Sequence, residues 1–141
     1  MDGQARRAPD AQWIERVARA TIAQLPAPFR AHLDDVVLVV EEWADDETLA
    51  ALGIDHPLDL TGLYHGLPVG EKALASGAMP DRIHLYRRAI LDEWVETGVD
   101  LEALVAHVTI HEIGHHFGLS DGDMHALEDQ VADGPGGEDR P

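Results

Sequence analysis

"DLEALVAHVTIHEIGHHFG", residues 100–118, is the stretch that decides how this chain folds. Asp100 suits the N-cap of a helix, and Gly118 suits the left-handed residue that ends one, so the segment predicts a single long helix between them. Apolar residues lie on both sides of this helix, Leu104 and Val108 on one and Ala106, Ile110, Ile113 and Phe117 on the other. A helix that is apolar on both sides is covered by other elements, so we expect it at the centre of the fold.

Two histidines, His111 and His115, lie four residues apart near the end of the predicted helix. This spacing places both imidazoles on one side of the helix, one turn apart, as a tetrahedral zinc ion requires of two ligands. Glu112 points about 100° around the helix from His111, so it can reach a water held by the metal but cannot be the same kind of ligand. We therefore interpret Glu112 as a general base.

The turn after the helix offers a third ligand. Gly118 can turn the chain back and bring Asp121 toward the two histidines, and two imidazoles with one carboxylate leave a fourth position for water. Asp123 and His125 remain alternatives, because one turn can present several neighbouring groups. The extended spacing of the motif favours Asp121.

Other polar side chains of the motif region have less specific interpretations. His116 points about 100° away from the second ligand and is predicted to be a supporting or surface residue. His107 is predicted to be a solvated or capping group. Candidate hydrogen-bond donors to an oxyanion are Tyr64, Tyr86 and His84.

Composition limits the class of protein. The chain has 141 residues without a break in composition, which predicts a single domain. Ten basic against 27 acidic residues give a formal charge of −17, so nucleic-acid and membrane partners are not expected. Without cysteine, a metal must be held by histidine and carboxylate. No apolar run suggests a signal peptide or a membrane span, and we expect a cytoplasmic protein.

The remaining sequence predicts a small domain with short tails. Residues 1–9 and 132–141 are rich in Gly, Pro and charge and are expected to be flexible, around a domain of residues 10–131. Periodicity predicts helices over 10–25 and 45–52, strands over 36–40, 60–67 and 82–88, and a loop over 68–80. The strand "VVLVV" (36–40) lacks polar alternation, which predicts that it lies at the centre of the sheet.

The segment "HEIGHHFGLSD" (111–121) resembles the extended zinc motif of metzincin-type zincins, in a variant with a final aspartate. Together with "GLYHGLPVGEK" (62–72) and "PDRIHLYRR" (80–88), the motif block "HEIGHHFGLSDGDM" (111–124) is similar to the blocks of a bacterial family of minimal zincin-like metallopeptidases. The resemblance implies an α+β fold, a compact single domain whose small mixed sheet packs against a central metal-binding helix and an N-terminal helix.

The same resemblance implies one zinc ion per chain, with His111, His115 and Asp121 as ligands and Glu112 as base. Larger metzincins have a third histidine where this chain has Asp121, so this site bears one more negative charge and a weaker Lewis acid. Their methionine turn also lies further downstream than Met124 does here.

We therefore predict a zinc-dependent metallopeptidase whose substrate is a peptide or protein. The substrate is expected to add a strand to an exposed edge of the sheet, either at 60–67 or at 82–88. The alternative is a metal-stabilised protein-binding module with little or no hydrolytic activity, because so small a domain has few residues to wall a cleft. A fourth protein ligand such as His125 would favour the module, and an open fourth position would favour the enzyme.

Overall fold

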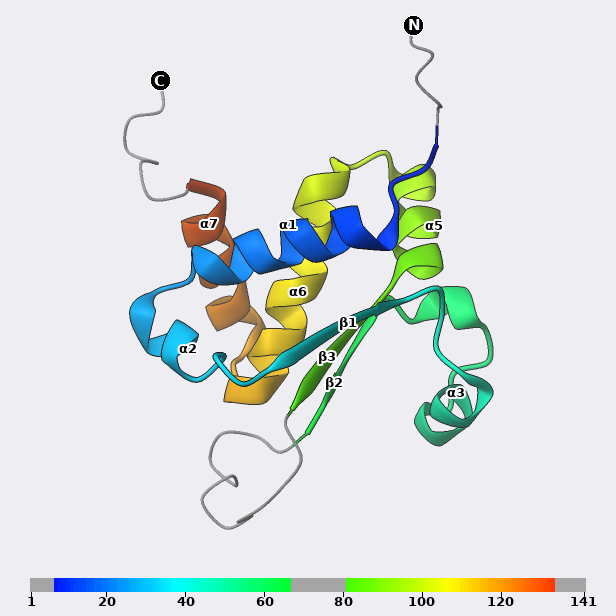
Figure 1. Ribbon diagram of the computed structural model, residues 1–141, viewed down its shortest axis with the longest axis horizontal. Coiled ribbons are helices and arrows are strands. Elements are labelled where there is room, and N and C mark those ends of the chain that lie inside the picture. The colour runs from blue at the N-terminus through cyan, green and yellow to red at the C-terminus, as the bar shows by residue number, and fades with distance from the viewer. Residues whose placement is uncertain (1–6, 67–80, 134–141) are drawn as a thin grey trace, which may run out of the picture.

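The computed structural model describes residues 7–66 and 81–133 (Figure 1). These form one small α+β domain in which helices surround a mixed sheet of three strands. The strands are β1 (Val37–Glu41), β2 (Gly62–His65) and β3 (Arg82–Tyr86). The helices are α1 (Ala11–Ala23), α2 (Ala27–Ala31), α3 (Asp46–Leu52), the 3-10 turn η1 (Pro57–Asp59), α5 (Arg87–Thr97), α6 (Leu101–Phe117) and α7 (Asp121–Asp133).

Helix α6 forms where the sequence predicts it. The Asp100 carboxylate accepts a hydrogen bond from the backbone N–H of Ala103 at its start, and Gly118, with φ of 66°, ends it. The helix contacts α1, α5, α7, β2 and β3, and α1 crosses it in Figure 1. Its central position is therefore confirmed, and the cause is the apolar surface on both of its sides.

The segment "VVLVV" does not lie at the centre of the sheet. The strand order is β1-β3-β2, with β1 parallel and β2 antiparallel to β3, so β3 is the central strand. Val37 of β1 is 42% exposed, and only Leu38 of this strand is buried. Helix α1 packs against β1 and provides the cover that its apolar residues need. The apolar run of residues 36–40 therefore reflects packing against a helix, and it does not indicate that the strand has neighbours on both sides.

Three α-helices, α2, α5 and α7, and the 3-10 turn η1 have no counterpart among the predicted elements. Helix α5 begins at Arg87, inside the segment predicted as a strand over 82–88. Helix α7 begins directly after the turn of the motif and continues to Asp133, so the segment predicted as a tail from residue 132 starts inside a helix. Residues 134–141 of this tail lie outside the described residues, as does the loop predicted over 68–80. Of the N-terminal tail, only residues 7–9 are described.

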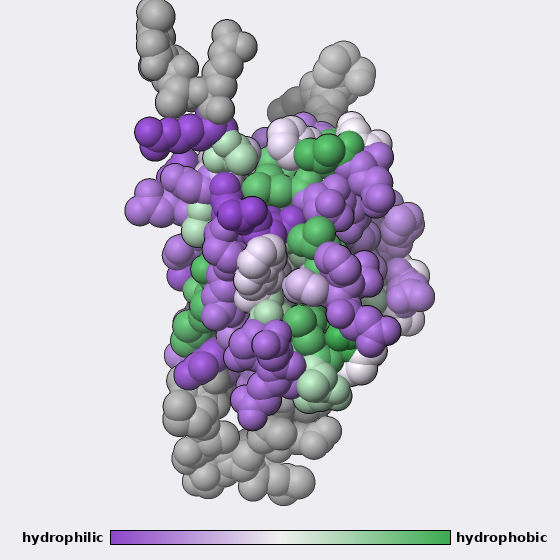
Figure 2. Space-filling model, turned by 90° about the vertical axis from the view of Figure 1, so that its right-hand side faces the viewer, coloured by the Kyte–Doolittle hydropathy of each residue, from purple (hydrophilic) through white to green (hydrophobic). Residues whose placement is uncertain are grey.

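The core lies between α1, α6, α7 and one face of the sheet. Its buried members come from elements along the whole described sequence, among them Ile14, Ile83, Val105, Ile113 and Leu127. The surface on the side of α3 and α5 is mainly hydrophilic, with separate apolar groups between the polar ones (Figure 2). Within residues 7–66 and 81–133, no helix combines the length and hydropathy that a membrane crossing requires.

Candidate metal centre

Glu112 is a buried carboxylate on the face of α6 that meets β2. Its side chain lies where Gly62 of β2 approaches the helix so closely that an added Cβ at Gly62 would stand 3.2 Å from Glu112 Cγ. The backbone N–H of Tyr64, also on β2, donates a hydrogen bond to the Glu112 carboxylate. Glu112 is therefore held at the edge of the sheet by its neighbours on β2, although it belongs to a helix.

The environment of Glu112 favours its protonated form. Burial raises the pKa of Glu112, while the nearby His115 and the hydrogen bond from Tyr64 act in the opposite direction. Glu112 Oε1 is buried and makes no hydrogen bond within the described residues, although His115 Nδ1 lies 3.3 Å away. A buried carboxylate with a raised pKa holds a proton more tightly than an exposed one, which suits a group that accepts a proton and later releases it.

The three predicted ligands lie in the same region but do not converge in the structure. His115 is on the exposed side of α6, with 61% of its side chain accessible, and His111 is half-buried. Burial lowers the pKa of His111, and Asp121, the first residue of α7, is close enough for its negative charge to oppose that shift. Among the described residues, these three are not a group whose ligand atoms all lie within 4.8 Å of one another. The ligand set His111, His115 and Asp121 stays a prediction.

One group of described residues does meet that distance, and it shares only His111 with the predicted set. It consists of His107, His111 and Glu128, the last from α7. Glu128 Oε2 lies 2.9 Å from His107 Nδ1, and Glu128 Oε1 lies 3.4 Å from His111 Nε2. Burial lowers the pKa of His111, as does the adjacent His107, so neutral imidazole, the form that binds metals, is favoured there.

The sequence did not indicate that Glu128 lies beside His107 and His111. Glu128 lies 17 positions after His111 in sequence, and only the docking of α7 on α6 brings them together. The available signal was the spacing of Met124, Leu127 and Val131, which are all buried and lie on one face of α7.

The start of α7 separates the alternatives for the third ligand. Ser120 and Asp123 form a reciprocal cap, in which the Asp123 N–H donates to Ser120 Oγ at 3.1 Å and the Ser120 N–H donates to Asp123 Oδ2 at 3.4 Å. The Asp123 carboxylate is therefore engaged in capping the start of α7. His125 is exposed on α7. Asp121 makes no such capping contact with the described part of the chain and lies next to the turn.

Met124 packs under the motif. Its side chain is 4% exposed, and an added Cβ at Gly114 would lie 2.1 Å from Met124 Sδ. Gly114 is one of the two unspecified positions inside the His-Glu-x-x-His segment, so here the glycine allows α7 to approach α6 closely. The Met124 side chain therefore packs against α6, the helix that carries Glu112, at the position of Gly114.

His116, predicted to be either a supporting or a surface residue, is buried. It is 1% exposed, and its Nδ1 lies 2.8 Å from the hydroxyl of Tyr64 and 3.2 Å from Asp81 Oδ2. The Tyr64 hydroxyl also donates to Asp81. This cluster of Tyr64, Asp81 and His116 joins β2, the start of β3 and the end of α6.

The cluster also bears on the candidate oxyanion donors. The hydroxyl of Tyr64 is engaged by Asp81 and His116, and burial raises the pKa of Tyr64 so that it stays protonated. His84 Nδ1 lies 2.8 Å from Glu41 Oε1, and Tyr86 is buried. The Tyr64 hydroxyl and the His84 ring are therefore engaged by other side chains, whereas burial, together with the charges of Glu41, Asp45 and Glu112, raises the pKa of Tyr86 to about 12.

Comparison with known proteins decides the relationship. The chain matches the family model described as zincin-like metallopeptidase over residues 33–131. The chain belongs to this family. A separate comparison with curated proteins gave no match.

Membership of the zincin-like metallopeptidase family implies zinc, and the residues present fit such an ion. Histidine and carboxylate are the donors that zinc accepts in the absence of cysteine. Two buried carboxylate oxygens near the histidines of α6, Glu112 Oε1 and Glu128 Oε1, make no hydrogen bond within the described residues. Buried oxygens of this kind are normally satisfied, so the pair indicates a missing polar or metal partner.

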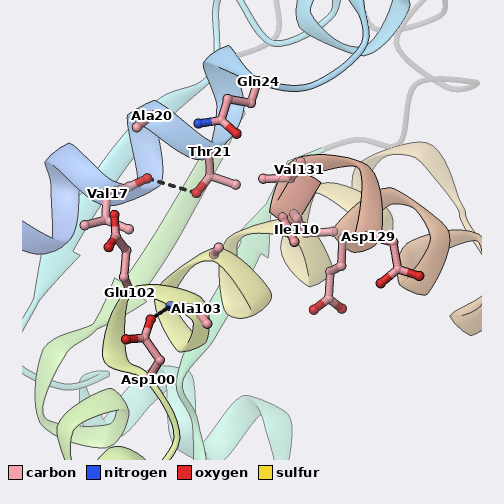
Figure 3. Close-up of a pocket in the computed structure, with 13 residues that line it drawn as sticks. Val17, Ala20, Thr21, Gln24, Asp100, Glu102, Ala103, Ile110, Asp129 and Val131 are labelled. Atoms are coloured by element: carbon pink, nitrogen blue, oxygen red, sulfur yellow. Dashed lines mark hydrogen bonds between the residues drawn. The ribbon is translucent and has the colours of Figure 1, made fainter. Parts of the chain in front are cut away.

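Two cavities lie beside elements that carry or contact the site of this zincin-like domain, although neither is lined by Glu112 or by the predicted ligands. One, of about 640 Å³, lies between α3 and the edge strand β2 and is lined by Leu52, Leu63, Tyr64 and His65 among others. The other, of about 570 Å³, lies between α1, α6 and α7 (Figure 3). Its wall combines apolar groups such as Val17 and Ile110 with the carboxylates of Asp100, Glu102, Glu128 and Asp129.

Replacing Tyr64 by Phe is expected to lower the free energy of unfolding by about 1 kcal/mol, because a hydrogen bond to the buried Asp81 and His116 is lost. Urea unfolding followed by circular dichroism measures the change. The matched control is Tyr86→Phe, which also removes the phenol oxygen of a buried tyrosine, but one whose hydroxyl makes no hydrogen bond within the described residues. Equal losses in the two variants would contradict a stabilising function for the cluster.

Proposed function

We propose that this protein is a zinc-dependent peptidase in which His111, His115 and Asp121 hold one zinc ion and Glu112 is the general base. The observation that carries the proposal is the position of Glu112. It is buried, it lies 3.3 Å from His115, and it is held against the edge of the sheet by the backbone of Tyr64. No structural need of the helix explains a carboxylate there, since burial of its charge costs free energy.

When bound, zinc supplies acidification of a water molecule and polarisation of the scissile carbonyl. Glu112 accepts a proton from the attacking water, whose oxygen forms a bond to the carbonyl carbon. As the C–N bond breaks, Glu112 donates this proton to the leaving amine nitrogen. The raised pKa of Glu112 supports both transfers, because the protonated form is stable enough to exist between the two steps.

The substrate is proposed to bind along β2. This strand is at the edge of the sheet, beyond β3, and it runs beside the cavity that separates it from α3. An extended peptide can pair with such an edge through its backbone, while the cavity accepts a side chain. Because Tyr64 on this strand contacts Glu112, a peptide paired with β2 has its backbone close to the base.

Elemental mass spectrometry tests the metal part of the proposal. After dialysis against metal-free buffer, the wild type is expected to retain about one zinc ion per chain, and His115→Ala and Asp121→Ala are expected to lose it. Asp123→Ala and His125→Ala are the matched controls and should retain zinc, because the Asp123 carboxylate caps the start of α7 and His125 is outside the proposed ligand set. Retention of zinc in both ligand variants would contradict this ligand set.

Hydrolysis of a mixture of unlabelled peptides, followed by mass spectrometry, tests the enzyme part. New peptide termini should appear with the zinc-loaded wild type and not after treatment with a chelator. A protein that retains zinc, binds peptides and produces no new termini would instead be the metal-stabilised binding module.

A further inference from the structure

Helix α6 carries three histidines at four-residue spacing, His107, His111 and His115. His111 therefore belongs to two pairs, and each pair has the geometry of a zinc-binding helix turn. The pair nearer the end of the helix is the one in the family motif. The other pair, His107 and His111, is the one on which Glu128 converges from α7.

The contacts of Glu128 resemble those of a metal ligand more than those of a simple ion pair. Its two oxygens are divided between the two imidazoles, at 2.9 Å from His107 Nδ1 and 3.4 Å from His111 Nε2. The oxygen nearer His111 is buried and makes no hydrogen bond within the described residues. A carboxylate oxygen and an imidazole nitrogen that face each other without a hydrogen bond can both bind one metal ion placed between them.

The distances require only a small adjustment. In tetrahedral zinc coordination two ligand atoms are roughly 3.3 Å apart, and here the ligand atoms of all three residues lie within 4.8 Å of one another. The two rings already lie with centroids 4.1 Å apart, and the His107 side chain is 44% exposed, so it can rotate.

A path to this group exists from solvent. Glu128 lines the cavity between α1, α6 and α7, and the same cavity exposes Asp100, Glu102 and Asp129 (Figure 3). Four carboxylates around one opening raise the local concentration of cations. The lining of this cavity includes Glu128 but not His107 or His111, and the His107 side chain, 44% exposed, opens the group to solvent.

We propose that His107, His111 and Glu128 form a second metal position, one helical turn before the predicted catalytic one. Because both positions need His111, an ion at the second position removes a ligand from the first. The consequence, which rests on the proposed function, is that excess zinc inhibits hydrolysis by occupying the second position.

Cobalt(II) titration tests the second position without reference to activity. Metal-free His115→Ala lacks the motif pair but retains His107, His111 and Glu128, and its altered side chain is 61% exposed, so the fold should persist. Visible absorption of bound cobalt should appear in this variant once cobalt is in excess, because the second position is expected to bind weakly enough to lose its ion on dialysis against metal-free buffer. Adding Glu128→Gln or His107→Ala should weaken cobalt binding at least about tenfold. Asp129→Asn, a neighbour in the same cavity wall, is the matched control and should leave binding within about twofold.

Activity with added zinc tests the consequence. Each variant is compared with its own rate at one zinc ion per chain. Excess zinc should inhibit the wild type and Asp129→Asn, and Glu128→Gln should need at least about tenfold more zinc for the same inhibition. Thermal unfolding of each metal-free variant checks that it is folded.

The outcomes separate this inference from the proposed function. The double variants His115→Ala/Glu128→Gln and His115→Ala/Asp129→Asn are compared for cobalt affinity. Equal affinity in the two would overturn the second position, whether or not peptides are hydrolysed. Cobalt binding that depends on His107 and Glu128, in a protein that hydrolyses nothing, would support the second position and overturn the proposed function. Equal inhibition of the wild type and Glu128→Gln by excess zinc would overturn the inhibitory consequence.

Discussion

Replacing Glu112 by Gln is expected to reduce kcat/KM for peptide hydrolysis by about 10² to 10⁴-fold while leaving zinc binding intact. Glutamine has nearly the shape of glutamate and retains one oxygen for the hydrogen bond from the Tyr64 backbone, but it cannot accept the proton of the attacking water. The measurement pairs the rate with zinc content of the same sample. The matched control is Glu102→Gln, which alters an exposed carboxylate on the same helix.

Stability gives this substitution a second readout. Because the pKa of Glu112 in the folded protein is raised above its ordinary value of 4.5, the metal-free folded state binds more protons than the unfolded state just above that pH. The free energy of unfolding should therefore fall as pH rises from about 4.5, and Glu112→Gln should remove that part of the decline. A glutamine variant that hydrolyses at the wild-type rate would exclude Glu112 as the base.

Replacing Gly114 by Ala is expected to lower the free energy of unfolding by about 2 kcal/mol, because the new Cβ overlaps Met124. The new Cβ would lie 2.1 Å from Met124 Sδ and 2.7 Å from Met124 Cγ. Because Cγ is close to the backbone of Met124, moving only the tip of the methionine does not relieve the overlap. This loss exceeds the gain of about 1 kcal/mol that alanine brings to a helix. Urea unfolding measures it. Zinc affinity should fall as well, since displacement of Met124 moves the start of α7, where Asp121 lies.

The control for Gly114 is Gly122→Ala, because a Cβ at Gly122 would meet only Ser120 Oγ at 3.9 Å. That substitution should be neutral or stabilising. Met124→Ala removes the overlapping side chain, so the double variant Gly114→Ala with Met124→Ala should be more stable than the sum of the two single effects predicts. Additive losses would mean that the close approach of α7 to α6 does not depend on this glycine.

Local signals in the sequence predicted the helix that carries the site. Asp10 and Asp100 cap α1 and α6 through their side chains, and Gly53 and Gly118 end α3 and α6 with positive φ. Such signals act over three or four residues, so they can be recognised without knowledge of the fold. The three strands were also found, although the central one was assigned wrongly, because strand order depends on pairing between distant segments.

What the sequence could not supply is the docking of α7. Its capping pair, Ser120 and Asp123, lies inside the stretch that also supplies the predicted third ligand, and the helix is rich in charge. Without α7 in place, Glu128 has no relation to His107 and His111. Burial of His116 could not be predicted either, because it depends on Tyr64 of β2 and on Asp81, the residue before β3.

Helix α1 lies outside the residues that match the family, which begin at 33. Yet Ile14, Val17 and Ala18 are buried in the same core as α6, and α1 packs on both α6 and β1. A fragment limited to residues 33–131 would leave this side of α6 open to water. The unit that folds is therefore longer than the unit that shares its sequence pattern with the family.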